Sequence, residues 1–187
     1  CGEKALAKPV EKDAMREMAE KVTADFKISR ADQGAFAHRS QTRAAAEIAS
    51  GRMAQEITPV TIPQRRKDPI IFDTDEHPRL SPIEKLATLP TPFREGGSVT
   101  AGNASGVNDG AAAVLVASAA AVKAHGLTPI ARISGTAVAG VPPRIMGIGP
   151  APASPTLMAR LGVSIGDIDL IQVNEPFAAA GPAVLRR

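Results

Sequence analysis

The stretch that decides the fold is GSVTAGNASGVNDGAA, residues 97–112. Residues 98–100 have strand character, residues 101–110 are mostly small or polar, and an Ala/Val-rich run follows as far as His125, before Gly126. This pattern predicts a short strand, a turn of small residues and a buried helix that ends at the glycine.

Two further strands are predicted after this helix. Residues 129–138 and 170–173 are apolar runs, with a short helix predicted at 156–161 and another helix after the last strand. Strands that alternate with helices are typical of βαβ units, so we predict an α/β fold with a parallel-rich sheet covered on both faces. Ligands of such sheets bind beyond the carboxyl ends of the strands, which directs attention to residues 101–110 and 174–177.

The first half of the chain differs from the second in charge. Residues 1–95 hold 16 basic and 15 acidic side chains, whereas residues 96–187 hold 6 and 4. The second half is rich in Ala, Gly and Val instead. We therefore predict two architectures, a charged α+β part followed by the α/β part.

Local patterns predict the elements of the charged part. Apolar residues at helical spacing predict a helix over 10–26, and the Ser29 cap predicts a second helix that runs to Gly51. Alternating β-branched residues at 56–62 and the run at 70–72 predict a hairpin. In the sequence SPIE, Ser81 is predicted to cap a short helix over 82–89.

The composition excludes several classes of function. The 187 residues are 44% hydrophobic but only 3% aromatic, without Trp or Tyr, so the aromatic platforms that bind single-stranded nucleic acid are nearly absent. No stretch approaches the ~20 apolar residues of a membrane span, and the first 25 residues show no apolar signal region. We therefore expect a cytoplasmic protein without a nucleic-acid or membrane partner.

Cysteine and histidine are few in this chain. The single cysteine, Cys1, excludes an internal disulfide framework. His38, His77 and His125 are far apart in the sequence, and none has a second ligand at helical spacing. No metal site is predicted.

Asn174 is the sharpest single candidate for a functional residue. It follows the apolar residues 170–173 and stands where parallel sheets hold their ligands. Asn is also a favoured helix N-cap, so the alternative is that Asn174 caps the next helix. Spacing alone favours neither of these two interpretations over the other.

Several motifs, in the same order along the chain, resemble those of the thiolases, the acyl-CoA C-acyltransferases. Residues 97–112 look like a segment that thiolases share, and VNEPFA at 173–178 resembles the Asn-Glu-Ala-Phe motif of the family. The other matching segments are ISRADQ at 28–33, DEHPR at 75–79 and MGIGPAPA at 146–153. The resemblance covers about residues 14–187, and residues 140–150 are similar to degradative and β-ketoadipyl-CoA thiolases.

This resemblance implies a fragment of the thiolase fold. That fold duplicates a βαβαβαββ unit and inserts a charged loop domain into the first copy. Residues 1–95 would be the CoA-binding loop domain, residues 96–130 the end of the N-terminal thiolase domain, and residues 131–187 the start of the C-terminal thiolase domain. The change in charge at Gly96 is then a domain boundary.

The resemblance also implies an activity, the cleavage of 3-ketoacyl-CoA by CoA or its formation by condensation. CoA is then a substrate and no cofactor is expected. The family uses a nucleophilic Cys, an activating His and a second Cys that acts as acid and base. Segments carrying these groups are expected before residue 1 and after Arg187, with Cys1 a truncation point rather than the nucleophile. The 187 residues alone are expected to be inactive.

One catalytic residue and much of the CoA site are implied within the chain. Asn174 matches the Asn that holds a water in the oxyanion hole, and Ser105 matches a residue that meets the pantetheine. Arg79 matches a residue near the CoA nucleotide. The remaining CoA-site and acyl-channel residues are Met15, Phe93, Ala101, Pro176 and Phe177, with Pro176 standing where the family usually has Ala.

An alternative of a different class is a non-catalytic CoA or acyl-CoA binding module. Such a module needs only the loop domain and the wall around Ser105. The resemblance further implies a homo-oligomer, a dimer or tetramer, for the full-length protein. It leaves acyl-chain specificity and the direction of the reaction open.

Overall fold

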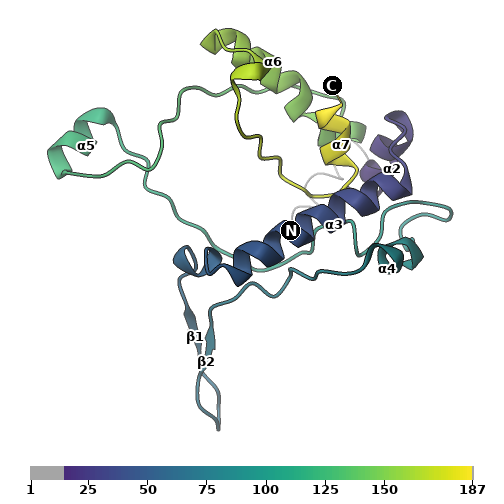
Figure 1. Ribbon diagram of the computed structural model, residues 1–187, viewed down its shortest axis with the longest axis horizontal. Coiled ribbons are helices and arrows are strands. Elements are labelled where there is room, and N and C mark those ends of the chain that lie inside the picture. The colour runs from purple at the N-terminus through teal and green to yellow at the C-terminus, as the bar shows by residue number, and fades with distance from the viewer. Residues whose placement is uncertain (1–14, 187) are drawn as a thin grey trace.

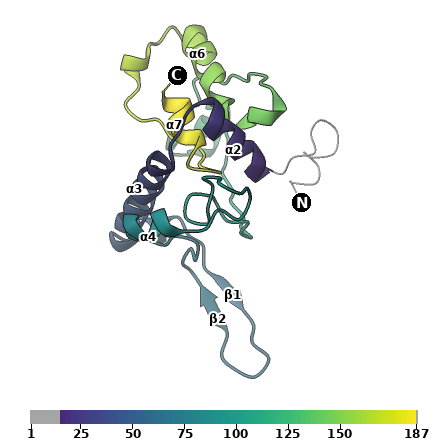
Figure 2. The same ribbon diagram turned by 90° about the vertical axis from the view of Figure 1, so that its right-hand side faces the viewer.

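The computed structural model describes residues 15–186. Helices α2, α3 and α7 lie together, a hairpin projects beyond one end of α3, and α5 stands apart from the other helices (Figures 1 and 2). The elements, in chain order, are α2 (Met15–Asp25), α3 (Arg30–Ala49), η1 (Met53–Gln55), β1 (Val60–Ile62), β2 (Ile70–Phe72), α4 (Ile83–Thr88), α5 (Ala119–His125), η2 (Pro143–Ile148), α6 (Pro150–Leu161), η3 (Ile165–Asp167) and α7 (Ala180–Leu185).

Helix α3 begins and ends as its sequence predicts. The Ser29 hydroxyl accepts a hydrogen bond from the Asp32 amide at 3.0 Å, and the Asp32 carboxylate accepts one from the Ser29 amide at 3.2 Å. This reciprocal pair is a capping box. At the other end Gly51 has a φ of 76°, a left-handed conformation that glycine adopts at little steric cost.

The predicted hairpin is confirmed. Strands β1 and β2 pair antiparallel, with Val60 opposite Phe72 and Ile62 opposite Ile70. Both strands are exposed, and Figure 2 shows the hairpin extending away from the helices.

The hydrophobic core joins three elements that are far apart in the sequence. Val22 of α2, Ile145 of η2 and Ala183 of α7 are buried together with Ile28. The side chains of Phe26 and Ile148 cover this cluster. Helix α2 is therefore packed against the C-terminal helix of the described chain, which matters for the site below.

The predicted parallel-rich sheet with βαβ units is not present among residues 15–186. Segments 98–100, 129–138 and 170–173, each predicted as a strand, do not form strands, and the sheet of the described residues consists of β1 and β2. A strand needs a neighbour to pair its backbone N–H and C=O groups, and these segments find none within the described residues. Strand character in the sequence is thus not sufficient for a strand.

The helix predicted up to His125 is shorter than expected. Residues 111–118 are not helical, and α5 begins only after Ser118, whose hydroxyl accepts a hydrogen bond from the Ala121 amide. Val114 and Leu115 are highly exposed, so this apolar stretch has no packing surface to order it as a helix. The predicted end is correct, because Gly126 has a left-handed conformation.

Two other helix starts differ from the predictions. Helix α6 begins at Pro150 rather than at 156, because prolines are tolerated in a first helical turn, where N–H groups have no intrahelical partner. Helix α4 begins at Ile83, with Pro82 rather than Ser81 as its N-cap and no capping side chain. The Ser81 carbonyl instead lies 3.0 Å from the His38 ring nitrogen Nδ1.

Some predictions fall outside the described residues. Cys1 and residues 10–14 of the predicted first helix are among them. Within residues 15–186, no helix is long and apolar enough to cross a membrane.

Candidate functional site

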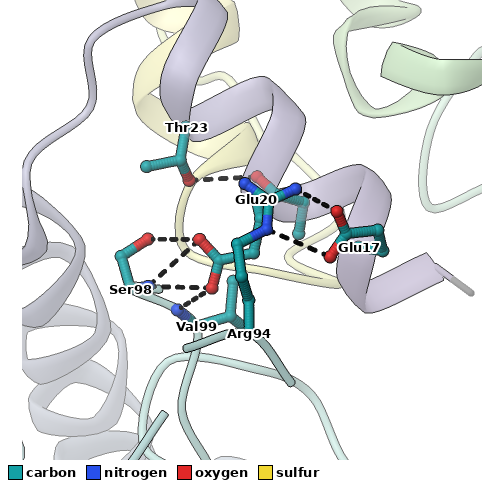
Figure 3. Close-up of polar contacts among 7 residues, drawn as sticks. Glu17, Glu20, Thr23, Arg94, Ser98 and Val99 are labelled. Atoms are coloured by element: carbon teal, nitrogen blue, oxygen red, sulfur yellow. Dashed lines mark hydrogen bonds and ion pairs between the residues drawn. The ribbon is translucent and has the colours of Figure 1, made fainter. Parts of the chain in front are cut away.

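The loop that carries Ser105 begins at Ser98 and Val99, which are hydrogen-bonded to the buried carboxylate of Glu20 on helix α2. Glu20 points from α2 toward the backbone of Ser98 and Val99 (Figure 3). Its oxygens accept hydrogen bonds from the Ser98 amide at 2.8 and 3.0 Å, from the Ser98 hydroxyl at 3.0 Å and from the Val99 amide at 2.7 Å. The beginning of the Ser98–Ser105 loop is therefore fixed to α2.

Two further buried polar side chains hold the same loop. Gln33 of α3 donates a hydrogen bond from Nε2 to the Ser98 hydroxyl at 2.9 Å. Asn103 accepts from the Thr100 amide at 2.7 Å and donates from Nδ2 to the Ser98 carbonyl at 2.9 Å. The Asn103 side chain also donates from Nδ2 to the Gln33 side-chain oxygen Oε1 at 3.4 Å. Residues 98–103 thus form a closed, internally bonded turn.

The end of this loop pairs with the segment that follows Asn174. The Ser105 amide donates to the Pro176 carbonyl at 2.9 Å, and the Ala178 amide donates to the Asn103 carbonyl at 2.8 Å. Ala104 and Phe177 form an antiparallel bridge between these two hydrogen bonds. The structure therefore brings together Ser105, Pro176 and Phe177, three residues that the resemblance assigns to one CoA site.

Three of the predicted site residues also share a small apolar cavity. Met15, Pro176 and Phe177 line a space of about 50 Å³ between α2, η2 and the start of α7. The other lining residues are Met18, Ala19, Val22, Met146, Gly147 and Ala180. Nearly the whole lining is apolar, and Met side chains adapt readily to an irregular ligand. We call this space the methionine cavity.

Phe93 lies against helix α2. The Arg16 guanidinium stands 4.6 Å from the centre of the Phe93 ring, a cation–π distance, and Arg94 forms an ion pair with Glu17. Residues 93–99 thus run alongside α2 from its first turn to Glu20. Phe93 is half-buried in this contact.

The Arg79 segment also reaches the loop. A methyl group placed on Gly106 would lie 2.7 Å from His77 Nδ1 and 2.3 Å from Asn108 Oδ1, so both side chains adjoin Gly106, the residue after Ser105. The Arg79 amide donates to the Gln41 side chain of α3 at 2.8 Å. The Arg79 side chain itself is exposed and available to a ligand.

Asn174 is exposed and does not cap a helix. Helix α7 begins at Ala180 with Ala179 as its N-cap, well beyond Asn174. The helix-cap alternative is therefore wrong. Asn174 lies shortly before residues 176–178, which pair with residues 103–105, but it does not line the methionine cavity. Ala101 is exposed within the Ser98–Ser105 loop.

Sequence reasoning missed the buried residues Glu20, Gln33 and Asn103. A Glu among the apolar residues of the predicted first helix was a usable signal, because an acidic side chain on a packed helix needs a partner. Gln33 and Asn103 gave no such signal, since both types are common in a first helical turn and in a polar loop. Within residues 15–186 no three His, Cys, Asp or Glu side chains are grouped to hold a metal ion.

The family models that match this chain are those of the two thiolase domains. The model described as "Thiolase, N-terminal domain" matches residues 2–120, and that described as "Thiolase, C-terminal domain" matches residues 127–187.

Similar proteins and structures bear thiolase names. The chain is 53% identical to a β-ketoadipyl-CoA thiolase of Pseudomonas putida, over 93% of this chain and 44% of that protein. It is 51% identical to an acetyl-CoA acetyltransferase of Syntrophomonas wolfei, over 90% of this chain and 42% of that protein. The crystal structure of the Bacillus anthracis acetyl-CoA acetyltransferase superimposes with a TM-score of 0.92 at 46% identity, covering 98% of this chain and 47% of that one.

These likenesses establish the fold of the chain, which is that of the corresponding part of a thiolase. The chain spans less than half the length of the relatives it matches.

Proposed function

The chain belongs to the thiolase family, and we propose that it carries much of the acyl-CoA site of an acyl-CoA C-acyltransferase. The reaction is the cleavage of a 3-ketoacyl-CoA by CoA to give an acyl-CoA and acetyl-CoA, or the reverse condensation. CoA and its thioesters are the substrates of this proposal, and it needs no resident cofactor.

The observation that carries this proposal is the pairing of residues 103–105 with residues 176–178. This pairing sets Ser105, the proposed pantetheine contact, beside Pro176 and Phe177, which line the methionine cavity. A thioester with its pantetheine along Ser105 would direct its acyl end toward an apolar space. Sites for small molecules combine such an apolar space with a few placed polar groups.

Each predicted residue has a role in this proposal. Asn174, exposed beside the paired segments, holds a water that stabilises the enolate oxygen as negative charge develops. Arg79 and Phe93 contact the nucleotide and pantetheine parts of CoA, and Ala101 extends the wall formed by Ser105. The half-buried Met15 contacts the acyl group.

The finer organisation is also proposed. Residues 1–95 form the CoA-binding loop domain, 96–130 complete the N-terminal thiolase domain and 131–187 begin the C-terminal one, and a parallel-rich sheet forms in the whole protein. The change from one family model to the other between residues 120 and 127 supports a boundary in this region. We further propose that the whole protein is a homo-oligomer.

The substrate class we propose is 3-oxoadipyl-CoA or a similar 3-ketoacyl-CoA. The 53% identity to a β-ketoadipyl-CoA thiolase supports this choice. Neither the geometry of the site nor the names of the relatives support a non-catalytic CoA-binding module.

A chimera tests the proposed function, because the chain spans less than half of its relatives. The 187 residues replace the matching segment of the Pseudomonas putida β-ketoadipyl-CoA thiolase, and CoA-dependent loss of 3-oxoadipyl-CoA and of acetoacetyl-CoA is measured. We expect thiolysis, faster with 3-oxoadipyl-CoA. A chimera that melts cooperatively, binds CoA and cleaves neither thioester would refute the proposal.

A further inference from the structure

The buried carboxylate of Glu20 has no role in the chemistry described so far. Glu20 is 3% exposed, and the loop backbone beside it is buried as well, with Val99 at 0% and Thr100 at 1%. Burial of an acidic side chain is costly unless donors replace its water. Here the donors are the backbone amides of Ser98 and Val99 together with the Ser98 hydroxyl.

The absence of a side chain at Gly97 leaves room for the Glu20 carboxylate. A methyl group on Gly97 would lie 2.5 Å from the Glu20 Oε1 oxygen and 2.9 Å from the Arg94 carbonyl. With any larger residue at 97, either the Glu20 carboxylate or the Arg94 segment would have to shift. The position of the Glu20 carboxylate therefore depends on glycine at residue 97.

Hydrogen bonds continue from Glu20 to the other side of the proposed site. Ser98, which is bonded to Glu20, accepts a hydrogen bond at its backbone carbonyl from the Asn103 side chain. The Asn103 carbonyl in turn accepts from the Ala178 amide, and the Ser105 amide donates to Pro176. Glu20 thus anchors one end of a bonded path that ends at residues 176–178.

Helix α2 contributes side chains both to the methionine cavity and to the contact with the Ser98–Ser105 loop. Met15, Met18, Ala19 and Val22 of α2 line the methionine cavity, whereas Glu20 on the same helix holds the Ser98–Ser105 loop. The cavity and the loop are therefore attached to one rigid element. Their relative position depends on the Glu20 contact.

We propose that Glu20 is a positioning residue that sets the Ser105 wall relative to the methionine cavity, with Gln33 and Asn103 as its partners. This inference rests on the proposed function. Its physical basis is that an active site loses rate steeply when binding elements shift by about 1 Å, on the order of 10²-fold. A carboxylate is suited to the role because it accepts from several N–H donors, whereas an amide would turn an NH₂ group toward one of them.

The first test uses the chimera and follows amide hydrogen exchange by mass spectrometry. In Glu20→Gln we expect exchange to become roughly tenfold faster in peptides covering 98–105 and also in those covering 174–180. The matched control is Glu17→Gln, which makes the same chemical change one turn earlier and removes the ion pair with Arg94. The control should leave the 174–180 peptides unchanged. Faster exchange confined to 98–105 would overturn the inference, because the loop would then not transmit the change.

The second test uses the active chimera and compares two thioesters of the same acyl group. One is the CoA thioester and the other is the N-acetylcysteamine thioester, which lacks most of the CoA handle. A positioning role predicts that Glu20→Gln lowers kcat/KM for the CoA thioester about 10- to 100-fold, chiefly through KM, and affects the truncated thioester much less. Equal losses with both thioesters would indicate general damage to the fold and overturn the inference.

The two proposals fail in different ways. A wild-type chimera that is folded but inactive refutes the proposed function, and the exchange experiment then still decides whether Glu20 couples the two segments. An active wild-type chimera in which Glu20→Gln behaves like Glu17→Gln refutes only the role of Glu20.

Discussion

The backbone carbonyl of Asn103 accepts a hydrogen bond from the amide of Ala178, 2.8 Å away. The two residues belong to different family-model matches, Asn103 to the N-terminal thiolase domain and Ala178 to the C-terminal one. This bond joins the loop of Ser105 to the segment after Asn174. The geometry of the proposed site therefore depends on a contact between the two parts of the chain.

Replacement of Asn174 should reduce turnover without weakening the fold. Asn174 is exposed and caps no helix, so Asn174→Ala should leave the melting temperature of the active chimera nearly unchanged. If its amide holds an oxyanion-hole water, kcat should fall on the order of 10² to 10³, because that interaction acts mainly in the transition state. Steady-state kinetics beside a thermal melt measures both quantities. An unchanged kcat would rule out the catalytic assignment.

Replacement of Ser105 or Arg79 should act on substrate binding instead. Ser105→Ala keeps the backbone amide that donates to Pro176, so the loop stays paired while the hydroxyl is lost. The Arg79 side chain is exposed, and its backbone amide keeps the bond to Gln41 in Arg79→Ala. We expect each variant to raise KM for the CoA thioester with kcat nearly constant. A fall in kcat at constant KM would contradict these assignments.

Two glycines should respond oppositely to the same substitution. A methyl group on Gly181 of α7 would lie 2.3 Å from the Phe36 ring, whereas one on Gly34 of α3 would meet nothing within 4 Å. Gly181→Ala should therefore destabilise the chain by about 1–3 kcal/mol through overpacking. Gly34→Ala should stabilise it by roughly 0.5–1 kcal/mol, because alanine favours the helix. Urea titration of the chimera measures both, and a neutral Gly181→Ala would show that α7 can move away from Phe36.

The capping box of α3 should make the chain sensitive to acid. Hydrogen bonds from the Ser29 side chain and backbone, and then from Arg186, lower the pKa of Asp32 from its usual 3.8. Since the folded pKa lies below the unfolded one, the stabilisation is complete above the unfolded pKa and is lost as the pH falls through the folded pKa. Asp167, bonded to Ser164, has its pKa lowered in the same way and contributes in the same range.

The test of this linkage is the stability of Asp32→Asn as a function of pH. Below about pH 4 the wild-type chain should lose stability more steeply than the variant, and Asp32→Asn/Asp167→Asn should be flatter still. Midpoints of urea unfolding of the chimera and its variants at several pH values supply the comparison. Parallel curves for wild type and variants would mean that neither carboxyl is perturbed in the folded chain.

The 187-residue chain should self-associate. Large apolar side chains in the unpaired segments are exposed, among them Val107, Val114, Leu115, Val138 and Leu170 at 82–91%. Exposed apolar stretches with unpaired backbone groups promote association. We expect binding of a hydrophobic dye and an apparent mass that rises with concentration in light scattering. Leu115→Lys should reduce both, and a monodisperse monomer with a sharp cooperative melt would contradict the prediction.

Local signals in the sequence predicted the elements whose hydrogen bonds join residues that are close together in the sequence. The Ser29 capping box, the left-handed glycines at 51 and 126 and the β1–β2 hairpin are all confirmed. Each depends on residues within a few positions of one another, so the information lies in one short stretch. The family motifs that identify the proposed site residues are similarly short.

The features that depend on distant partners were not predictable in this way. Residues 129–138 and 170–173 have the composition of strands, but pairing requires a neighbour that the described residues do not provide. The burial of Glu20 and the bond between Asn103 and Ala178 likewise join segments that are remote in sequence. Residue types in the chain thus identify the family and the candidate CoA contacts, while the folded backbone determines which of those contacts meet, because hydrogen bonds and packing act over distances in space rather than along the sequence.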